Sequence, residues 1–214
     1  MSENTGTETQ EKRHPSKDRI EHLRHQIIER FPAVRRVFGK SGTEPTPRQL
    51  INEAGARLRQ EYESDYDPLT GLLEKRGYER ERTKAVERAK RENLNATVAF
   101  VDLDGLKQVN DAKGHAEGDK LLKSAADAIQ ASIRKSDLSG RLGGDEFQVF
   151  LTDTTPELAD NWKKRLVEKM NARNVNASIG LTQVDLDDME GSVNRADKLM
   201  YVEKYAKKGN QTNG

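Results

Sequence analysis

The stretch at residues 141–151, RLGGDEFQVFL, constrains the fold of this chain more than any other part of the sequence. After GGDE, apolar side chains recur at every second position, which is the period of a β-strand, and the paired glycines favour a tight turn. The pattern predicts a hairpin whose tip carries Asp145 and Glu146. A solvated acidic turn is the plainer interpretation, so the rest of the chain must show whether this tip is a site.

Around this hairpin, helical and strand patterns alternate from Asp67 onward. DPLTGLLEKRGYERERTKAVERAKREN indicates a turn into a long charged helix, and ATVAFVDLD a buried strand that ends in two aspartates. A helix follows in AEGDKLLKSAADAIQASIR, and another begins at Thr155-Pro156 after the hairpin. NVNASIGLTQV then indicates a strand and SVNRADKLMYVEKYAK a last helix. This order predicts an α+β fold, with helices packed on a mostly antiparallel sheet.

The region before Asp67 has a different character. Residues 1–17 are polar and charged, which predicts a flexible tail. Residues 18–64 carry two amphipathic helix patterns, one before Pro32 and one after Thr46-Pro47. Their apolar stripes need a partner surface, which is the main domain, a second copy of the chain or a regulatory protein. We therefore expect a tail at 1–17, a regulatory or dimerising helical extension at 18–64, and a main domain at 65–214.

Composition excludes several functional classes. The 214 residues include 37 basic and 36 acidic side chains, and a net charge of +1 offers no broad basic surface for nucleic acid. The absence of cysteine excludes disulfides, thiolate metal sites and a thiol nucleophile. No apolar run approaches the roughly 18 residues of a membrane span, and the first residues lack the apolar core of a signal peptide. These features predict a cytoplasmic protein.

Two acidic positions far apart in sequence are expected to meet in the sheet. The strand that ends at Asp102 and the hairpin tip at Asp145 can lie side by side in this element order. Clustered carboxylates repel one another unless a cation lies between them, and hard oxygen ligands without histidine or cysteine favour Mg²⁺ or Mn²⁺. Mg²⁺ bound by few carboxylates completes its shell with water and substrate phosphates. The sequence therefore indicates nucleotide chemistry.

Six motifs give the last two thirds of the chain a family resemblance. In chain order they are DPLTGL, FVDLDGLKQVND, GHAEGD, RLGGDEF, ASIG and ADKLMY, between residues 67 and 201. Their order and spacing resemble the GGDEF family of diguanylate cyclases, which condense two GTP molecules into cyclic di-GMP. The resemblance implies a fold like that of nucleotidyl cyclases and polymerase palms, in agreement with the predicted element order. Because each domain offers one GTP pocket, it also implies a homodimer for catalysis.

The resemblance assigns the acidic residues to the metal and to catalysis. Asp102, the carbonyl of Leu103 and Asp145 resemble the metal ligands of the family. Glu146 is either a further ligand or the group that helps to deprotonate the attacking 3′-hydroxyl. The cation would polarise the α-phosphate and neutralise the leaving pyrophosphate.

The substrate contacts implied by the resemblance lie on both sides of these acids. Asn110 and Asp119 match the guanine-reading pair, whose acceptors and donors fit guanine and not adenine. The residues expected to hold phosphates are Gly105, Leu106, Lys107, Lys204 and Lys208. Gly143 and Gly144 let the backbone approach the nucleotide. Ordinary alternatives remain open: a turn cap for Asn110, a helix-dipole preference for Asp119 and a solvated helix face for the lysines.

Three local features qualify the resemblance. The family ending K-x-x-G-[RK]-N is replaced by KYAKKGN, so Lys208 stands where arginine is usual. Its ammonium supplies a point charge and lacks the planar, two-pronged donor arrangement of a guanidinium. Leu106 and Leu142 replace common aromatic residues. Arg134 and Asp137 form an R-x-x-D pattern at the offset of the family's inhibitory product site, with a salt-bridged helix end as the alternative.

We expect an active, product-inhibited diguanylate cyclase. The alternatives are a catalytically weak domain that binds cyclic di-GMP or GTP as a regulatory module, and a GTP-binding protein whose N-terminal helices dock on a partner.

Overall fold

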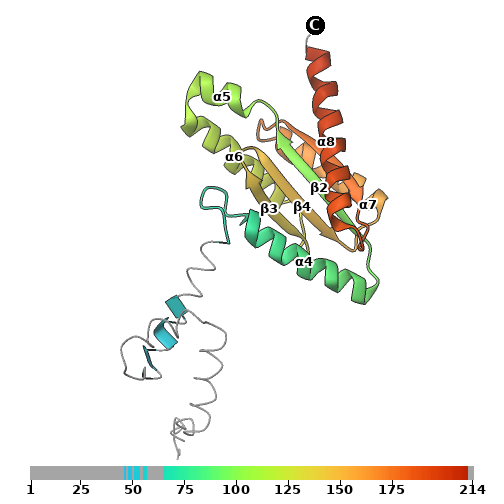
Figure 1. Ribbon diagram of the computed structural model, residues 1–214. Helices are drawn as coiled ribbons and strands as arrows, with labels where there is room; N and C mark the ends of the chain where they lie inside the picture. Colours follow the sequence, from blue (N-terminus) through green and yellow to red (C-terminus); the bar gives the residue numbers. More distant parts are fainter. Residues whose placement is uncertain (1–45, 47, 50, 54, 57–64, 212–214) are drawn as a thin grey trace, which may run out of the picture. The chain divides into compact units, whose positions relative to one another are not determined.

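The computed structural model describes residues 46, 48–49, 51–53, 55–56 and 65–211 (Figure 1). It divides into two units, the first ending at Tyr62 and the second beginning at Glu63. In the first unit, residues 48–49, 51–53 and 55–56 are helical. Thr46 Oγ1 accepts the Gln49 amide at 3.3 Å, and the Thr46 amide donates to Gln49 Oε1 at 2.9 Å, which forms a capping box. A helix is thus present after Thr46-Pro47, as predicted, whereas the tail at 1–17 and the helix before Pro32 lie outside the described residues.

The second unit is built on a five-stranded sheet of order β1-β3-β4-β2-β5. The strands are β1 (Leu73–Glu74), β2 (Ala96–Leu103), β3 (Leu138–Gly143), β4 (Glu146–Thr152) and β5 (Ala177–Gln183). The central strand β2 pairs antiparallel with β4 and β5, β3 pairs antiparallel with β4, and only the short β1 runs parallel to its neighbour β3. The predicted α+β fold with a mostly antiparallel sheet is confirmed.

Helices cover both faces of this sheet (Figure 1). They are α4 (Lys75–Glu92), α5 (Leu106–Lys113), α6 (His115–Gln130), α7 (Pro156–Asn171) and α8 (Met189–Gln211). Helices α6 and α7 pack on one face, and α4 and α8 on the other. The sequence patterns did not predict α5, which is separated from α6 by Gly114 at φ 85°. A residue with positive φ there turns the chain so that α5 folds back against α6.

Strand β2 contributes side chains to the hydrophobic cores on both faces of the sheet. All eight of its residues are buried, because helices cover both faces, and this explains its nearly continuous apolar run. Ala99 and Val101 face the α6–α7 core, while Val98 and Phe100 face the α4–α8 core. The end of β2 is thereby fixed with little freedom to shift.

Helix α8 lies directly against the backbone of β5. A Cβ on Gly180 would stand 1.9 Å from the carbonyl oxygen of Ala196 and 2.3 Å from the amide nitrogen of Met200. Only glycine permits this approach. The contact holds α8 beside the end of β2, where the predicted acidic site lies. Within the described residues, no helix is long and apolar enough to cross a membrane.

Candidate active site at the end of strand β2 and the start of strand β4

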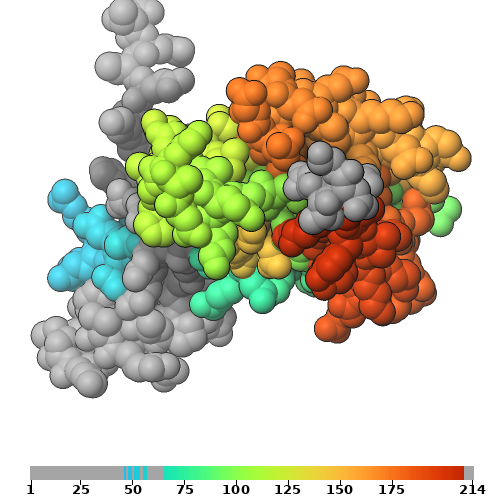
Figure 2. All heavy atoms as spheres, turned by 90° about the horizontal axis from the view of Figure 1, so that it is seen from above, coloured from blue at the N-terminus to red at the C-terminus, as the bar shows by residue number. Residues whose placement is uncertain are grey.

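Strand register brings the predicted acidic residues together. Asp102 is the direct antiparallel partner of Glu146, and the Leu103 amide donates to the Asp145 carbonyl at 3.1 Å. Gly143 and Gly144 form the hairpin tip with φ of 150° and 51°, values that favour glycine. Seen from above, the gold atoms of this hairpin lie between the green atoms of α5 and α6 and the red atoms of α8 (Figure 2). The expected meeting of the two acidic segments is therefore present.

The electrostatics of this acidic cluster favour a cation. Burial raises the pKa of Asp102, and the Asp145 charge adds to this, while a hydrogen bond from Lys204 opposes it. Partial desolvation raises the pKa of Glu146, and the charges of Asp102 and Asp145 raise it further. Carboxylates that raise one another's pKa are close enough to repel, and a positive ion or group between them relieves that repulsion.

Helix α8 contributes a cation to this cluster. Lys204 Nζ donates to Asp102 Oδ1 at 2.5 Å, and the side chain of Asp102 is only 8% exposed. Burial disfavours the charged amine, but the bond to Asp102 and the nearby acids outweigh it and raise the pKa of Lys204. The resemblance predicts Lys204 as a phosphate contact, and the structure places this lysine at the acidic cluster. Lys208, one turn later, has its ammonium 5.8 Å from the centre of the Tyr205 ring.

A second lysine of α8, Lys207, was not singled out from the sequence. Its Nζ donates to the Ala177 carbonyl at 2.6 Å and lies 3.6 Å from Asp104 Oδ2. Ser178 Oγ donates to the other oxygen of Asp104 at 2.9 Å. Asp104 is thus tied to β5 and α8, which supports the turn after β2. The sequence signal was weak, because a lysine in a charged helix is ordinarily solvated.

The predicted guanine-reading pair lies on two helices that pack together. Asn110 belongs to α5 and Asp119 to α6. A Cβ on the neighbouring Gly118 would stand 1.9 Å from Asn110 Oδ1, so the amide rests directly on α6. That oxygen is buried and has no hydrogen-bond partner among the described residues, while Asp119 is exposed. A buried acceptor without a donor is costly, so the position of this amide is an unusual feature of the α5–α6 contact.

The predicted phosphate-binding backbone lies at the start of α5. Gly105 caps the helix with φ 83°, Leu106 is its first residue and Lys107 is exposed. The first amides of a helix lack intrahelical acceptors, and the helix dipole favours an anion there. The turn after β2 therefore presents amide donors within a few residues of Asp102.

An arginine that sequence reasoning missed fixes the hairpin tip. Arg141 donates to the Gly144 carbonyl through Nε at 3.1 Å and Nη2 at 2.8 Å, and through Nη1 to both carboxylate oxygens of Asp67 at 3.2 Å. Burial opposes the charge of Asp67, but hydrogen bonds from Thr70 and the Arg141 guanidinium lower its pKa overall. Arg141 thus ties the turn before α4 to the residue preceding Asp145. Its presence in RLGGDEF, and that of Asp67 in DPLTGL, was the available signal.

Comparison with known proteins identifies this architecture. The family model described as "Diguanylate cyclase, GGDEF domain" matches residues 64–210, which contain all the site residues described above. The chain belongs to the GGDEF family. The GGDEF domain therefore occupies most of the chain, and the sequence resemblance is confirmed.

Relatives of the GGDEF domain include named cyclases. The chain is 31% identical over 176 residues to the probable diguanylate cyclase DgcE of Escherichia coli K12, covering 77% of this chain and 16% of that protein. It is 32% identical over 168 residues to the diguanylate cyclase DgcS of Shewanella oneidensis, covering 75% and 56% respectively. The chain thus spans only part of the length of both relatives.

A solved structure shares the fold. The crystal structure of a sensory box/GGDEF family protein from Caulobacter crescentus aligns with a TM-score of 0.61 at 30% identity, covering 66% of this chain and 99% of that one.

The carboxylate oxygens of the acidic cluster in the GGDEF domain are suitable ligands for a hard cation. Within the described part of the chain, no group of three or more His, Cys, Asp or Glu side chains is gathered tightly enough to hold a metal alone. Mg²⁺ needs no such cage, since one or two carboxylates with water and substrate phosphates complete its shell. Asp102 and Glu146, which face each other in register, supply hard carboxylate oxygens of that kind.

The R-x-x-D pattern of the GGDEF domain lies at a separate cavity. Asp137 does not pair with the Arg134 side chain: its carboxylate accepts the backbone amides of Arg134 at 2.8 Å and Thr152 at 3.0 Å. Asp137 thus has a structural role at this turn through backbone amides, and the choice between a product site and an ordinary helix end stays open. Arg134 and Asp137 line a cavity of about 130 Å³ that also includes Arg165 and Trp162, which the sequence did not single out. Trp162 Nε1 is buried without a hydrogen-bond partner among the described residues.

Proposed function

We propose that this chain is a diguanylate cyclase, which joins two GTP molecules into cyclic di-GMP and releases two pyrophosphates. The observation that carries the proposal is the register that sets Asp102 opposite Glu146, with Asp145 at the adjoining turn. Membership of the GGDEF family and the named cyclases among its relatives support it. The reaction requires GTP, which places the catalytic domain in the cytoplasm.

Mg²⁺ or Mn²⁺ would be held by Asp102, Asp145 and the Leu103 carbonyl, with Glu146 as a further ligand or a base. The bound ion supplies neutralisation of the triphosphate charge and polarisation of the α-phosphate. Lys204 adds a positive charge at the same place, because its ammonium already lies against Asp102. The amides that begin α5, with Lys107, and Lys208 on α8 complete the phosphate contacts.

Each turnover forms two phosphodiester bonds by the same displacement. The 3′-oxygen of one GTP attacks the α-phosphorus of the other, the bond to the β-phosphate breaks, and pyrophosphate leaves. Where Glu146 acts as the base, it accepts the hydroxyl proton, a role suited to a carboxylate whose pKa is raised by burial and by neighbouring acids. The proton then passes to water.

Guanine selectivity comes from Asn110 and Asp119. Guanine offers N1–H and an exocyclic amine to side-chain acceptors, whereas adenine has an unprotonated N1. An exposed carboxylate at Asp119 accepts from the same edge. A site built around such hydrogen bonds rejects the analogue that leaves them unmade, so GTP is preferred over ATP.

Two chains are needed for one product. Each GGDEF domain holds one GTP, and cyclic di-GMP contains two symmetric linkages, so two domains face each other about a two-fold axis. The N-terminal residues 18–64 set the monomer–dimer equilibrium by self-association or by binding a regulatory protein.

Product regulates the enzyme through the second cavity. Arg134, Arg165 and Asp137 suit the guanine edges and phosphates of cyclic di-GMP, because arginine binds both as a fork. The carboxylate of Asp137 also anchors the Thr152 amide at the end of β4, the strand that begins at Glu146. Product bound here can therefore act on the catalytic hairpin.

The direct test is incubation of the purified chain with GTP and Mg²⁺, followed by chromatographic separation of the nucleotides. We expect cyclic di-GMP from GTP and no cyclic dinucleotide from ATP. GTP binding without any product would reject the cyclase proposal in favour of a regulatory binding module.

A further inference from the structure

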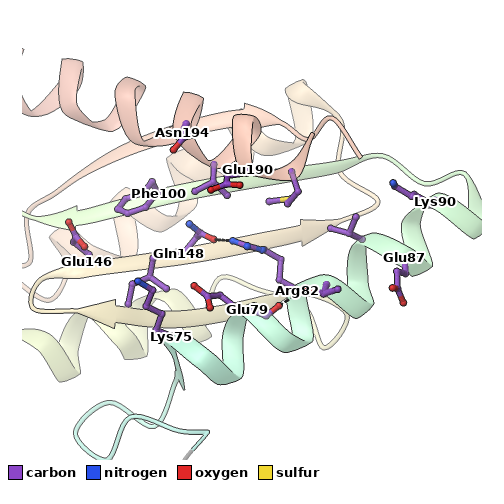
Figure 3. Close-up of a pocket in the computed structure, with 15 residues that line it drawn as sticks. Lys75, Glu79, Arg82, Glu87, Lys90, Phe100, Glu146, Gln148, Glu190 and Asn194 are labelled. Carbon is purple, nitrogen blue, oxygen red and sulfur yellow. Dashed lines mark hydrogen bonds between the residues drawn. The ribbon is translucent and has the colours of Figure 1, made fainter. Parts of the chain in front are cut away.

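A larger cavity lies on the opposite side of the β3–β4 hairpin from the cavity that Arg134 and Asp137 line. It also lies apart from the predicted GTP contacts. It has a volume of about 740 Å³ and is enclosed by α4, α8 and the sheet between them (Figure 3). We call it the α4–α8 cleft. Of all the residues assigned to the GGDEF site above, only Glu146 lines it. Its size falls within the range of small-molecule sites.

The floor of the α4–α8 cleft presents polar donors beside an aromatic ring. Phe100 and Gln148 are direct partners across β2 and β4, and their exposed fractions are 7% and 1%. Arg82 extends from α4 across the cleft, and its Nη1 donates to Gln148 Oε1 at 2.8 Å (Figure 3). The amide nitrogen of Gln148 has no acceptor among the described residues. Two nitrogen-bearing groups thus converge at the floor.

Within the described part of the chain, the arginine at this floor forms no ion pair. Arg82 is half-buried, and its side-chain contacts among the described residues are the neutral amide of Gln148 and the Tyr78 ring, 5.8 Å away. Glu79 lies one turn before it on α4 and lines the same cleft, yet forms no ion pair with it. A partly desolvated guanidinium with unused donors is stabilised by an anion, and a carboxylate matches its planar fork. The floor therefore favours a carboxylate.

The walls define the rest of the ligand. Apolar contacts come from Val86 on α4, Leu142 on β3, and Met189 and Val193 on α8, which together with Phe100 suit a compact apolar or aromatic body. Charged side chains stand around them, namely the acids Glu79, Glu87, Glu146 and Glu190 and the lysines Lys75 and Lys90. With Arg82, the lining therefore carries three cationic and four acidic side chains, and it offers no excess of positive charge for a polyanion such as a nucleoside triphosphate, so the ligand carries one negative group and not several.

We propose that the α4–α8 cleft binds a small organic carboxylate with an apolar body, whose carboxylate contacts Arg82 and Gln148 and whose body rests on Phe100. Such a ligand bridges α4 and α8. Gln148 lies two residues along β4 from Glu146, and α8 carries Lys204, so occupancy is coupled to the acidic cluster. The cleft is then an effector site, a consequence that rests on the proposed cyclase activity.

Phenylacetate is a suitable probe, with the neutral phenylacetamide and the cationic phenethylamine as matched compounds. Saturation-transfer NMR on the full chain at millimolar probe should show binding of phenylacetate, with phenylacetamide and phenethylamine weaker by roughly tenfold or more, as expected for loss of a charge-assisted hydrogen bond. Absence of phenylacetate binding, or equal binding of all three, would overturn the proposal.

Amino-acid substitutions test whether phenylacetate binds in the α4–α8 cleft. Arg82→Gln should weaken phenylacetate by a similar factor, whereas Arg88→Gln, an exposed change on the same helix outside the cleft, should not. Gln148→Glu supplies Arg82 with an internal carboxylate and should also exclude the probe, which covers the case that Arg82→Gln fails to fold. Phenylacetate binding that persists in either folded variant contradicts the site. If phenylacetate binds as predicted yet GTP turnover is absent, the cleft stands and the proposed function fails.

Discussion

Replacing Gly118 by alanine should damage guanine recognition while leaving the fold intact. A Cβ at this position would stand 1.9 Å from Asn110 Oδ1, 2.9 Å from its Cγ and 3.3 Å from its Nδ2. Ordinary contacts begin at about 3.5 Å, so the oxygen must move by about 1.6 Å. The obstructed atoms belong to the end of a rotatable side chain, and the amide can swing away without displacing either helix.

Gly118→Ala should change the free energy of GTP binding more than the free energy of unfolding. Alanine inside a helix is favoured over glycine by up to about 1 kcal/mol, which offsets much of the strain on α6. Displacing the Asn110 amide leaves guanine N–H groups without an acceptor, at a cost of about 1 to 3 kcal/mol, or roughly 5- to 150-fold in GTP affinity.

The assay is isothermal titration of GTP into wild type, Gly118→Ala, Asn110→Ala and the double variant, with urea unfolding as the stability control. Because both changes remove the same contact, the double variant should lose little more than either single variant. Unchanged GTP affinity in a folded Gly118→Ala protein would refute the reasoning, and so would losses that add in the double variant.

Three further predictions concern other parts of the domain. Gly180→Ala forces a Cβ against the backbone of α8 and should lower the free energy of unfolding by about 3 kcal/mol, whereas Gly209→Ala, with open space around it, should not lower it; urea denaturation compares them. Specific activity should rise with enzyme concentration, and deleting residues 1–64 should change that dependence; identical curves would exclude a dimerising role. Arg134→Ala should keep the initial rate but weaken inhibition by cyclic di-GMP, and should weaken the product-induced fluorescence change of Trp162, the single tryptophan; unchanged titrations would contradict the product site.

Much of the fold followed from local pattern. The continuous apolar run of β2 and the alternation in β4 both predicted strands, and both segments are strands in the structure, buried almost throughout because helices cover both faces of the sheet. The meeting of Asp102 with the hairpin followed from element order alone. Helix α5 was missed, since its eight residues carry no buried side chain and its apolar pattern is correspondingly weak.

The parts that could not be predicted depend on contacts between distant segments. Arg141 binds Asp67 across 74 positions, and Lys207 reaches the end of β2 only because Gly180 lets α8 approach β5. Neither residue has a local pattern that reveals its partner. The pairing of Arg82 with Gln148 likewise requires knowing which face of β4 lies under α4.

The stoichiometry of GTP conversion by wild type and Asp145→Asn tests the central claim most directly. Purified chain with GTP and Mg²⁺ should yield one cyclic di-GMP and two pyrophosphates for every two GTP consumed, measured by chromatography and mass spectrometry. Asp145→Asn removes a negative charge at the proposed metal ligand and should abolish the product while retaining the wild-type circular dichroism spectrum. Near-normal cyclic di-GMP production by folded Asp145→Asn, or no product from the wild type, would contradict the account.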